Sequence, residues 1–423
     1  MPGKEIKQAF AGYLLHAPEP QPGELTQVGP GTAGGEYLRR FWHPVAFSSD
    51  LGDVPVRIRI LGEDLVIFRD KSGQVGLLHL QCPHRNASLE FGIISDSGIR
   101  CCYHGWLFDV DGSILEMPGE PADSDYKDKF CHGAYPTREF KGLVFAYFGP
   151  PDRVPDFPLF DSLERPGTRL IPSGWTPGRK YVWPCNWVQV KENSMDPVHT
   201  FFLHTIASGA QFAPEFGIVP EIEYEQTPIG MVYIASRRVG DNVWVRLHDL
   251  IMPNIHQVAS VLEDGRKERR FGAPYLTHWA VPIDDYSFME IGWLHETDDM
   301  RYDQSTVDKL HFGMLDDRPY GERQRQPGDY DAQTSQGRLN NFDTEHLATS
   351  DQGVAMFRRL LREGIRSVKA GKDPMGVAPA RGQSIHTYTQ NAVVKAPKLD
   401  DPDAEKEQLR SIGRRVLAGE FRD

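Results

Sequence analysis

Residues 82–84, Cys82-Pro83-His84, and residues 101–104, Cys101-Cys102-Tyr103-His104, decide the fold of this chain. They read C-x-H and C-x-x-H with 16 residues between them, so each short segment supplies one thiolate and one imidazole. Such a set can hold zinc, or a [2Fe-2S] cluster with sulfur on one iron and nitrogen on the other. Zinc fingers usually group Cys with Cys and His with His, so the mixed segments favour the cluster.

The residues around these segments strengthen that interpretation. CPHR at 82–85 and YHGWLFD at 103–109 resemble the two ligand loops of Rieske proteins. The resemblance implies that the cluster-binding residues are Cys82, His84, Cys101 and His104. Cys101 matches the ligand position, because Cys102 stands only two residues before His104.

Composition narrows the class of protein. The chain has 423 residues, enough for two or three domains, and is 39% hydrophobic and 25% charged, as globular proteins are. A net charge of −12 predicts no nucleic-acid partner, which would require a basic surface. No run approaches the ~20 apolar residues of a transmembrane helix, and no signal-peptide pattern opens the chain. With Cys102, Cys131 and Cys185 predicted to stay reduced, we expect a cytoplasmic protein without a membrane partner.

The pattern of strands, helices and turns predicts four segments. They are an N-terminal extension (1–40), an all-β domain carrying the cluster (41–150), a catalytic domain (151–395) and a C-terminal helical tail (396–423). Turn-rich residues 149–155 mark the main boundary. Strands are expected at 56–60, 65–68, 231–234, 243–247 and 278–281, and helices at 351–368 and 403–417. Thr349 or Ser350 can cap the first helix, and the polar stretch 298–341 is either a solvated loop or a cover.

A second metal-binding pattern lies in the predicted catalytic domain. Asp196, His199 and His204 form D-x-x-H-x-x-x-x-H. Two His and one carboxylate on one face of an iron form the facial triad of non-haem Fe(II) oxygenases, with open positions for O₂. On a regular helix, residues five apart point about 140° away from each other, given ~3.6 residues per turn. We therefore predict a π-bulge or a helix break between His199 and His204.

The two patterns together, in this order, resemble the Rieske non-haem iron aromatic oxygenases, in particular alpha subunits of the phthalate-dioxygenase type. The resemblance implies an α+β fold. An N-terminal all-β Rieske domain precedes a C-terminal helix-grip (START-like) catalytic domain with an antiparallel sheet. It also implies two cofactors, a Rieske [2Fe-2S] cluster and a mononuclear Fe(II).

The third iron ligand has to come from an acidic residue further along the chain. Residues 345–351, EHLATSD, resemble a stretch that follows the iron-binding Asp shortly in phthalate-dioxygenase-type members. Counting back from it indicates Asp329, with Asp331 as the alternative. Asp351 begins a predicted helix, where a negative charge is favourable in any protein.

The resemblance also implies how electrons arrive. In the family, the position of Asp196 hydrogen-bonds the position of His199 and bridges to a Rieske histidine of a neighbouring subunit in a homotrimer, a role we therefore assign to Asp196. No GxGxxG follows a predicted strand, so NAD(P)H and flavin are expected only on a separate reductase, with or without a ferredoxin.

The expected reaction is oxidation of an aromatic carboxylate with O₂. Length and flanking residues are similar to those of 5,5′-dehydrodivanillate O-demethylase oxygenase components, which favours O-demethylation of a methoxylated, lignin-derived aromatic acid with release of formaldehyde. The alternatives are cis-dihydroxylation or ring hydroxylation of a phthalate-like acid and, in another class, a pure electron-transfer Rieske protein. Arg246 and Asn193 are candidate substrate contacts, chosen over Arg237 and Arg238. Val232 stands where the resemblance would place a phthalate-binding arginine.

Overall fold

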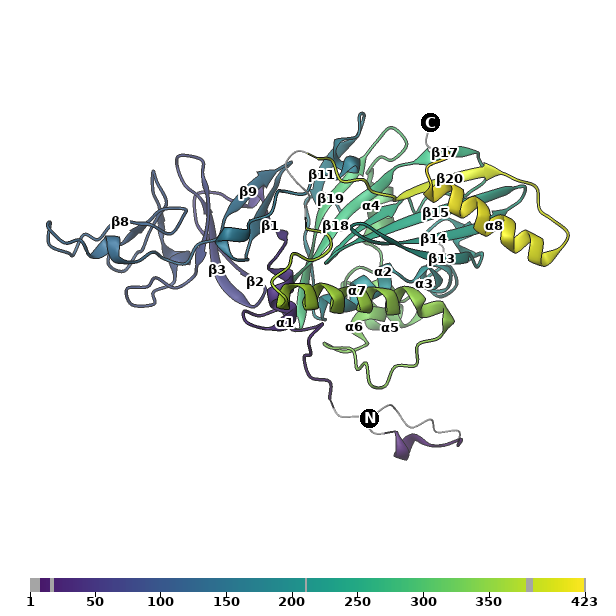
Figure 1. Ribbon diagram of the computed structural model, residues 1–423, viewed down its shortest axis with the longest axis horizontal. Coiled ribbons are helices and arrows are strands. Elements are labelled where there is room, and N and C mark those ends of the chain that lie inside the picture. Colours follow the sequence, from purple (N-terminus) through teal and green to yellow (C-terminus); the bar gives the residue numbers. More distant parts are fainter. Residues whose placement is uncertain (1–7, 16–18, 210, 378–382, 422–423) are drawn as a thin grey trace.

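The computed structural model describes residues 8–15, 19–209, 211–377 and 383–421. The parts of the predicted N-terminal extension and tail at 1–7, 16–18 and 422–423 lie outside the described residues. The molecule is elongated, with small sheets at one end and a large sheet at the other (Figure 1). Within the described residues, no helix is both long and apolar enough to cross a bilayer.

Three small antiparallel sheets form the N-terminal end. They are β1 (Trp42–Phe47), β10 (Leu143–Tyr147) and β9 (Thr137–Phe140); β2 (Val56–Ile60), β3 (Glu63–Arg69) and β4 (Val75–His79); and β5 (Ile93–Ile94), β6 (Ile99–Arg100), β7 (Leu107–Phe108) and β8 (Ile114–Glu116). The expected strands at 56–60 and 65–68 are β2 and part of β3. The strands of the last sheet have only two or three residues each, so most of its chain lies in turns, which suits loops that have to hold a cofactor.

A ten-stranded antiparallel sheet forms the other end. Its main path runs β11-β19-β18-β16-β15-β14-β13, and β12, β17 and β20 pair at its sides. The strands are β11 (Arg169–Ser173), β12 (Tyr181–Trp183), β13 (Glu221–Thr227), β14 (Gly230–Val239), β15 (Asn242–Ile251), β16 (Ile255–Ala259), β17 (Arg269–Gly272), β18 (Pro274–Asp284), β19 (Ser287–Glu296) and β20 (Gln390–Lys395).

Helices cover both faces of this sheet. They are α1 (Ala33–Leu38), α2 (Trp187–Ser194), α3 (Pro197–Phe201), α4 (Gln304–His311), α5 (Tyr320–Arg325), α6 (Asp329–Thr334), α7 (Gln352–Lys369) and α8 (Pro402–Leu417). The cap of α7 is Asp351, not the expected Thr349 or Ser350, because the chain makes a 3-10 turn over 349–351 before the helix begins.

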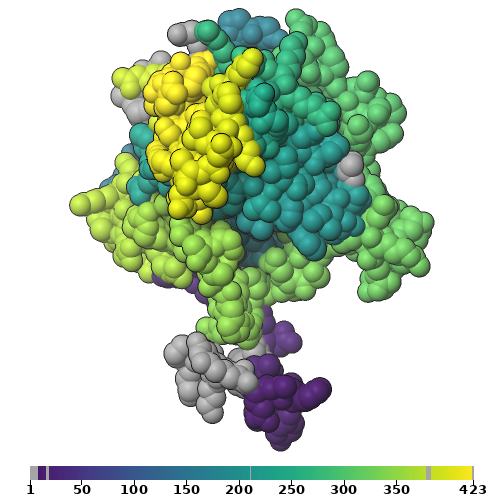
Figure 2. Space-filling view, turned by 90° about the vertical axis from the view of Figure 1, so that its right-hand side faces the viewer, coloured from purple at the N-terminus to yellow at the C-terminus, as the bar shows by residue number. Residues whose placement is uncertain are grey.

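The alternation of strand side chains assigns the two faces. On β14, Met231 and Tyr233 lie in the same apolar cluster as Phe357 of α7, whereas Val232 lies with Leu409 of α8. Seen from that end, the C-terminal helix covers strands of the sheet (Figure 2). Val232 therefore cannot occupy a pocket on the α2 and α7 face, and its neighbour Tyr233 can.

One apolar core joins the two ends. The ring of Phe145 on β10 lies 5.6 Å from Trp279 on β18 and 5.7 Å from Trp293 on β19. Leu25 and Val28, which precede α1, belong to the same core. The predicted fold class, an all-β N-terminal part followed by a helix-covered antiparallel sheet, is confirmed.

Candidate metal centres

The two loops with Cys82 and Cys101 have the same backbone geometry. In each, the Cys N–H donates to a carbonyl five residues on, at 2.9 Å for Ala87 and 2.8 Å for Trp106. In each, the Cys carbonyl accepts from the N–H four residues on, at 2.8 Å from Asn86 and 3.1 Å from Gly105. Asn86 and Gly105 have φ of 60° and 74°, the left-handed region that Gly and Asn tolerate best.

These loops separate the donor types. The thiols of Cys82 and Cys101 are buried next to each other, and burial raises the pKa of Cys82 to about 11. His84 and His104 are exposed, with ring centroids 4.4 Å apart, and His84 stacks on Trp106 at 4.7 Å. A cluster with one sulfur-bound and one nitrogen-bound iron requires this arrangement, a pair of thiols inside and a pair of imidazoles outside. Cys102 is exposed, unlike the two buried thiols.

The second centre brings His199, His204 and Asp329 together. One donor atom from each of the three lies within 4.8 Å of the other two. His204 Nε2 lies 3.3 Å from Asp329 Oδ2, and His199 Nε2 lies 3.8 Å from Asp329 Oδ1. The Asp329 side chain is only 8% exposed.

Helix geometry explains how histidines five residues apart share this centre. The α3 helix ends at Phe201, and the chain continues as a π-helix over Phe202–Ala207. Because a π-helix bonds residue i to residue i+5, it brings His204 back to the side of His199. The predicted distortion between the two histidines is confirmed.

Hydrogen bonds on the far side of each ring fix which nitrogen faces Asp329. His199 Nδ1 donates to the main-chain carbonyl of Asp196, and His204 Nδ1 donates to Gln211 Oε1 at 2.6 Å. Both Nε2 atoms are thereby left as lone-pair donors toward the carboxylate, as metal-binding histidines require.

Asp196 caps α3 and faces the outside of the centre. Its Oδ1 accepts from the N–H groups of Val198, at 2.8 Å, and His199, at 3.3 Å. Its Oδ2 lies 3.8 Å from His199 Nδ1, so in one subunit the main-chain carbonyl, rather than the expected carboxylate, bonds that ring. The Asp196 side chain remains 31% exposed.

The other acidic candidates have different partners. Asp331 pairs with Arg323 at 2.6 Å and accepts from the N–H of Gly328 at 3.0 Å, which caps α6. Asp351 accepts from the N–H of Ala348 at 2.7 Å. The backbone at Gly328 passes so close to Gly313 that a Cβ on Gly328 would lie 2.2 Å from Gly313 Cα. This contact sets the position of the start of α6, where Asp329 lies.

Comparison with known proteins agrees with both centres. Residues 41–136 match the Rieske [2Fe-2S] domain. The tert-butanol monooxygenase / tert-amyl alcohol desaturase oxygenase subunit of Aquincola tertiaricarbonis is 43% identical over 97% of this chain and 91% of its own length. The phenoxybenzoate dioxygenase subunit alpha of Ectopseudomonas oleovorans is 40% identical, covering 89% of this chain and 92% of that protein.

The chain belongs to the oxygenase subunits of the Rieske non-haem iron oxygenases. The 5,5′-dehydrodivanillate O-demethylase oxygenase subunit of Sphingobium sp. strain SYK-6 is 31% identical over 90% of this chain and 89% of its own length. The fold is also that of NdmA from Pseudomonas putida CBB5 with caffeine, at TM-score 0.62, 20% identity, and coverage of 83% of this chain and 100% of the other.

Membership of the family identifies the cofactors as a Rieske [2Fe-2S] cluster and a non-haem iron. The residues fit both, because the paired thiols and imidazoles suit the cluster and two directed Nε2 atoms with a buried carboxylate suit the iron. The zinc alternative and the pure electron-transfer alternative are wrong, since the matched relatives are oxygenase subunits.

A pocket opens from the iron centre over the face of the sheet. Its apolar wall consists of Val190, Phe212, Val258, Val261, Leu310 and Met314. Its polar wall consists of Trp175, Tyr233, Arg246, His248 and His256. Asn193 lines it and donates to Asp329 Oδ1 at 3.2 Å, so it holds a ligand as well as facing the cavity. The polar stretch 298–341 is a cover, because α4 and α6 from it contribute Leu310, Asp329 and Gln333.

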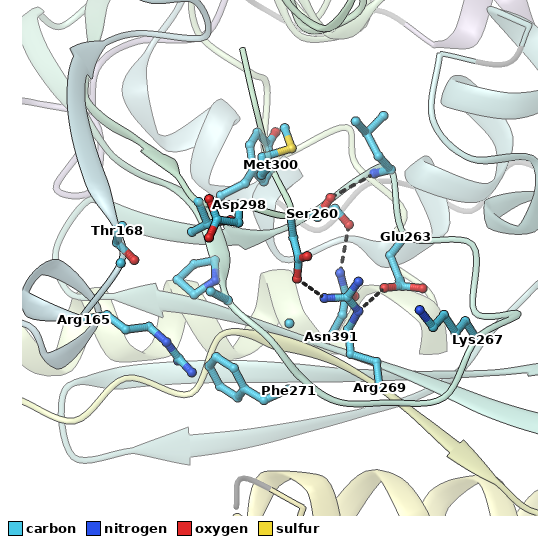
Figure 3. Close-up of a pocket in the computed structure, with 18 of the residues that line it drawn as sticks. Arg165, Thr168, Ser260, Glu263, Lys267, Arg269, Phe271, Asp298, Met300 and Asn391 are labelled. Carbon is cyan, nitrogen blue, oxygen red and sulfur yellow. Dashed lines mark hydrogen bonds and ion pairs between the residues drawn. The ribbon is translucent and has the colours of Figure 1, made fainter. Parts of the chain in front are cut away.

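A larger cleft of about 560 Å³ lies outside this pocket (Figure 3). Its walls carry both signs of charge, including Arg269 paired with Glu263 and with Asp299. Tyr275 lines both spaces, and Ser260 of the cleft accepts from Arg246 through its carbonyl at 3.0 Å. The cleft lacks the ligand triad, so we place the chemistry in the inner pocket despite its smaller size.

Sequence reasoning missed most of the polar wall. His248 follows Arg246 by two residues on β15, so the alternation of that strand could have placed both on one face. His256 carries no local signal, because only the pairing of β16 with β15 and β18 brings it to the pocket.

Proposed function

We propose that this subunit oxidises an aromatic carboxylate that carries an ether bond, with O-demethylation of a methoxylated aromatic acid as the preferred reaction. The observation that carries the proposal is Arg246. The residue is 3% exposed and lines the iron pocket, and its guanidinium donates to Tyr233 Oη at 3.2 Å and to the Ser260 carbonyl. Among the described residues, no carboxylate lies within ion-pair distance of it. A buried cation without a counter-ion is costly, and a substrate carboxylate would supply one.

The relatives support this substrate class. Two of the relatives are named for phenoxybenzoate and dehydrodivanillate, which are aromatic acids with an ether oxygen. Ring hydroxylation or cis-dihydroxylation of such an acid remains the alternative reaction, because both begin with the same bound carboxylate. Release of formaldehyde distinguishes demethylation from either.

The residues divide the work as follows. When bound, the cluster supplies single electrons and the iron binds and activates O₂. Arg246 anchors the carboxylate at one end of the pocket, and Phe212, Leu310 and Met314 enclose the ring and exclude water. Asn193 holds the Asp329 carboxylate in place at the other end.

A second candidate function is hydroxylation of a branched aliphatic alcohol. The relative that is 43% identical is named for tert-butanol, and the inner pocket encloses only about 60 Å³. A small neutral alcohol needs less of that space than an aromatic acid does, but it would leave Arg246 unneutralised.

We further propose a homotrimer in the cytoplasm, supplied with electrons by a ferredoxin or a flavin reductase. The two centres of one chain lie in different parts of the molecule (Figure 1). Apolar side chains are exposed beside each, Tyr103 (55%) near the cluster and Phe202 and Ile206 (57% each) beside the iron ligands. Contact between these two surfaces in neighbouring subunits would bury both and bring the cluster of one close to the iron of the next.

Turnover of a substrate panel tests the proposal. The protein, a reductase and NADH would be incubated with methoxylated benzoates, phenoxybenzoate, their methyl esters and tert-butanol. We expect oxidation of the acids, formaldehyde from the methoxylated ones, and at least tenfold slower oxidation of the esters. Turnover of tert-butanol alone would replace the proposal with the second candidate.

A further inference from the structure

His248 is a buried polar side chain in the pocket wall that forms no hydrogen bond with the residues that the structure describes. It is 5% exposed and lines the iron pocket. Neither of its ring nitrogens has a hydrogen-bond partner among the residues that the structure describes. Buried polar atoms are almost always paired, so unpaired nitrogens on a ring that lines a cavity indicate a partner that binds in the cavity.

The strand register holds this ring in position. His248 lies opposite Tyr233 in the pairing of β14 and β15, and the two rings stack with centroids 5.0 Å apart. His256 stacks on the other side at 5.9 Å, and Trp175 follows it at 5.9 Å. Because its two faces are covered, only the edge of the His248 ring, which carries the nitrogens, remains available to a ligand.

The neighbouring histidine differs in this respect. His256 Nδ1 accepts from Lys191, and its Nε2 lies 3.4 Å from Glu290 Oε1. Both nitrogens of His256 are therefore directed at groups behind the wall. Among these two stacked histidines, only His248 can bind a molecule in the pocket.

The charges around His248 indicate the kind of group it would meet. Arg246 precedes it by two residues on the same face, and Lys191 lies behind its neighbour His256. Burial, Arg246, Lys191 and His199 all act to hold its pKa well below the usual value, so the ring is neutral and has one N–H to donate. The Arg246 cation beside a neutral N–H donor favours a carboxylate over a neutral oxygen.

We propose that His248 is a specificity-determining residue that donates a hydrogen bond to the substrate carboxylate held by Arg246. One donor fixes the position of a carboxylate, and a second donor from a different direction fixes its rotation. His248 thereby selects which carbon of the ring or ether faces His199, His204 and Asp329. This inference rests on the proposed function, because it requires a carboxylate substrate.

Substitutions at His248 test the inference in the metal-loaded protein. His248→Phe keeps the stacked ring and removes the nitrogens, and His248→Gln keeps an N–H donor. His295→Gln is the matched control, since His295 is a buried histidine of β19 bonded to Thr277 at 2.9 Å and outside the pocket. The dissociation constant of an aromatic acid and of its methyl ester would be measured anaerobically by calorimetry, and product positions by mass spectrometry.

For His248→Phe we expect an acid dissociation constant about 10- to 100-fold higher, the loss of one hydrogen bond to a charged group. Ester binding should change less than threefold, and products should spread over more than one position. His248→Gln should recover most of the acid affinity, and His295→Gln should alter neither affinity nor product. Metal content and thermal unfolding verify that each variant is folded.

The outcomes separate this inference from the function on which it rests. If the unmodified protein binds no aromatic acid, the proposed function fails first. If it binds the acid, and His248→Phe binds the same acid equally well with the same product, His248 has no role in recognition. Equal losses for acid and ester in His248→Phe would show a packing defect and would also overturn the inference.

Discussion

The two metal centres of this chain are built in opposite ways. The cluster loops join short strands, and their imidazoles are exposed while the thiols are buried. The iron ligands come from α3, a π-helical segment and α6, and they lie over a ten-stranded sheet in a closed pocket. The first arrangement suits contact with another protein, and the second suits a small molecule with little water. Exposure of the ligands is therefore a guide to what each centre exchanges.

The largest expected effects come from removing the ligands of one centre only. Cys82→Ala should abolish the Rieske absorption and EPR signals and all turnover, while the iron site still binds one metal ion. Acid-labile sulfide and iron content check this result. Purified protein with stoichiometric zinc and no labile sulfide would contradict the cluster assignment.

The reverse variant acts on the buried centre. Asp329→Ala should lose mononuclear iron and turnover but keep the cluster signal, because its carboxylate joins both histidines. Asp331→Ala is the control, since Asp331 pairs with Arg323 and should cost only about 1 kcal/mol of stability. Iron loss in Asp331→Ala and not in Asp329→Ala would show that the ligand was assigned two residues too early.

A smaller effect is expected where the two centres meet across subunits. Asp196→Asn should keep both metals and lower turnover by at least tenfold, because the exposed carboxylate is the proposed link to a neighbouring cluster. Mixing Cys82→Ala with His199→Ala protein and allowing reassembly should restore part of the activity. Full activity in a monomer would contradict the proposed trimer.

A buried pair of charges behind the pocket wall, Glu290 and Lys191, can be tested through the stability of the protein alone. Burial raises the pKa of Glu290 to about 7 and lowers that of Lys191 to about 8, and His256 lies between them. Glu290→Gln should destabilise the protein by about 3 kcal/mol at neutral pH, because it leaves a buried ammonium unpaired. The double variant Lys191→Met, Glu290→Gln should recover most of that loss in urea unfolding; no recovery would mean that the two charges are not coupled.

The smallest effect concerns the exposed end. Burial raises the pKa of Glu63, but hydrogen bonds from His79 and Tyr135, together with Arg39, outweigh it and lower the pKa from 4.5 to about 2. This carboxylate contributes stability above its unfolded pKa, and the contribution is lost as pH falls through 4.5 toward 2. Glu63→Gln should cost about 1–2 kcal/mol at neutral pH, allowing for solvent screening. Urea unfolding should show the difference shrinking below about pH 4.5; a constant difference would exclude the charge as its cause.

Local chemistry explains what the sequence could predict. The mixed Cys and His spacing led to the cluster, and the impossible geometry of histidines five apart on an α-helix led to the distortion between His199 and His204. The polar wall was predictable only in part, because Arg246 and His248 share one face of β15, whereas His256 joins them only through the pairing of β15 with β16. Val232 shows the same difficulty, since a shift of one residue along a strand moves a side chain to the other face.

Contacts between the two ends of the molecule limit which segments can be exchanged with those of a relative. Arg39 donates to Glu63 at 2.6 Å, Phe145 packs on Trp279, and a Cβ on Gly364 of α7 would lie 2.4 Å from the ring of Tyr37. A chimera that grafts only residues 41–136 from a relative would cut the Arg39–Glu63 pair and separate β1 from its partner strand β10. A chimera that folds would also have to include the segment around α1 and the surface of α7 that faces it. The cluster domain and the catalytic domain therefore have to be exchanged together.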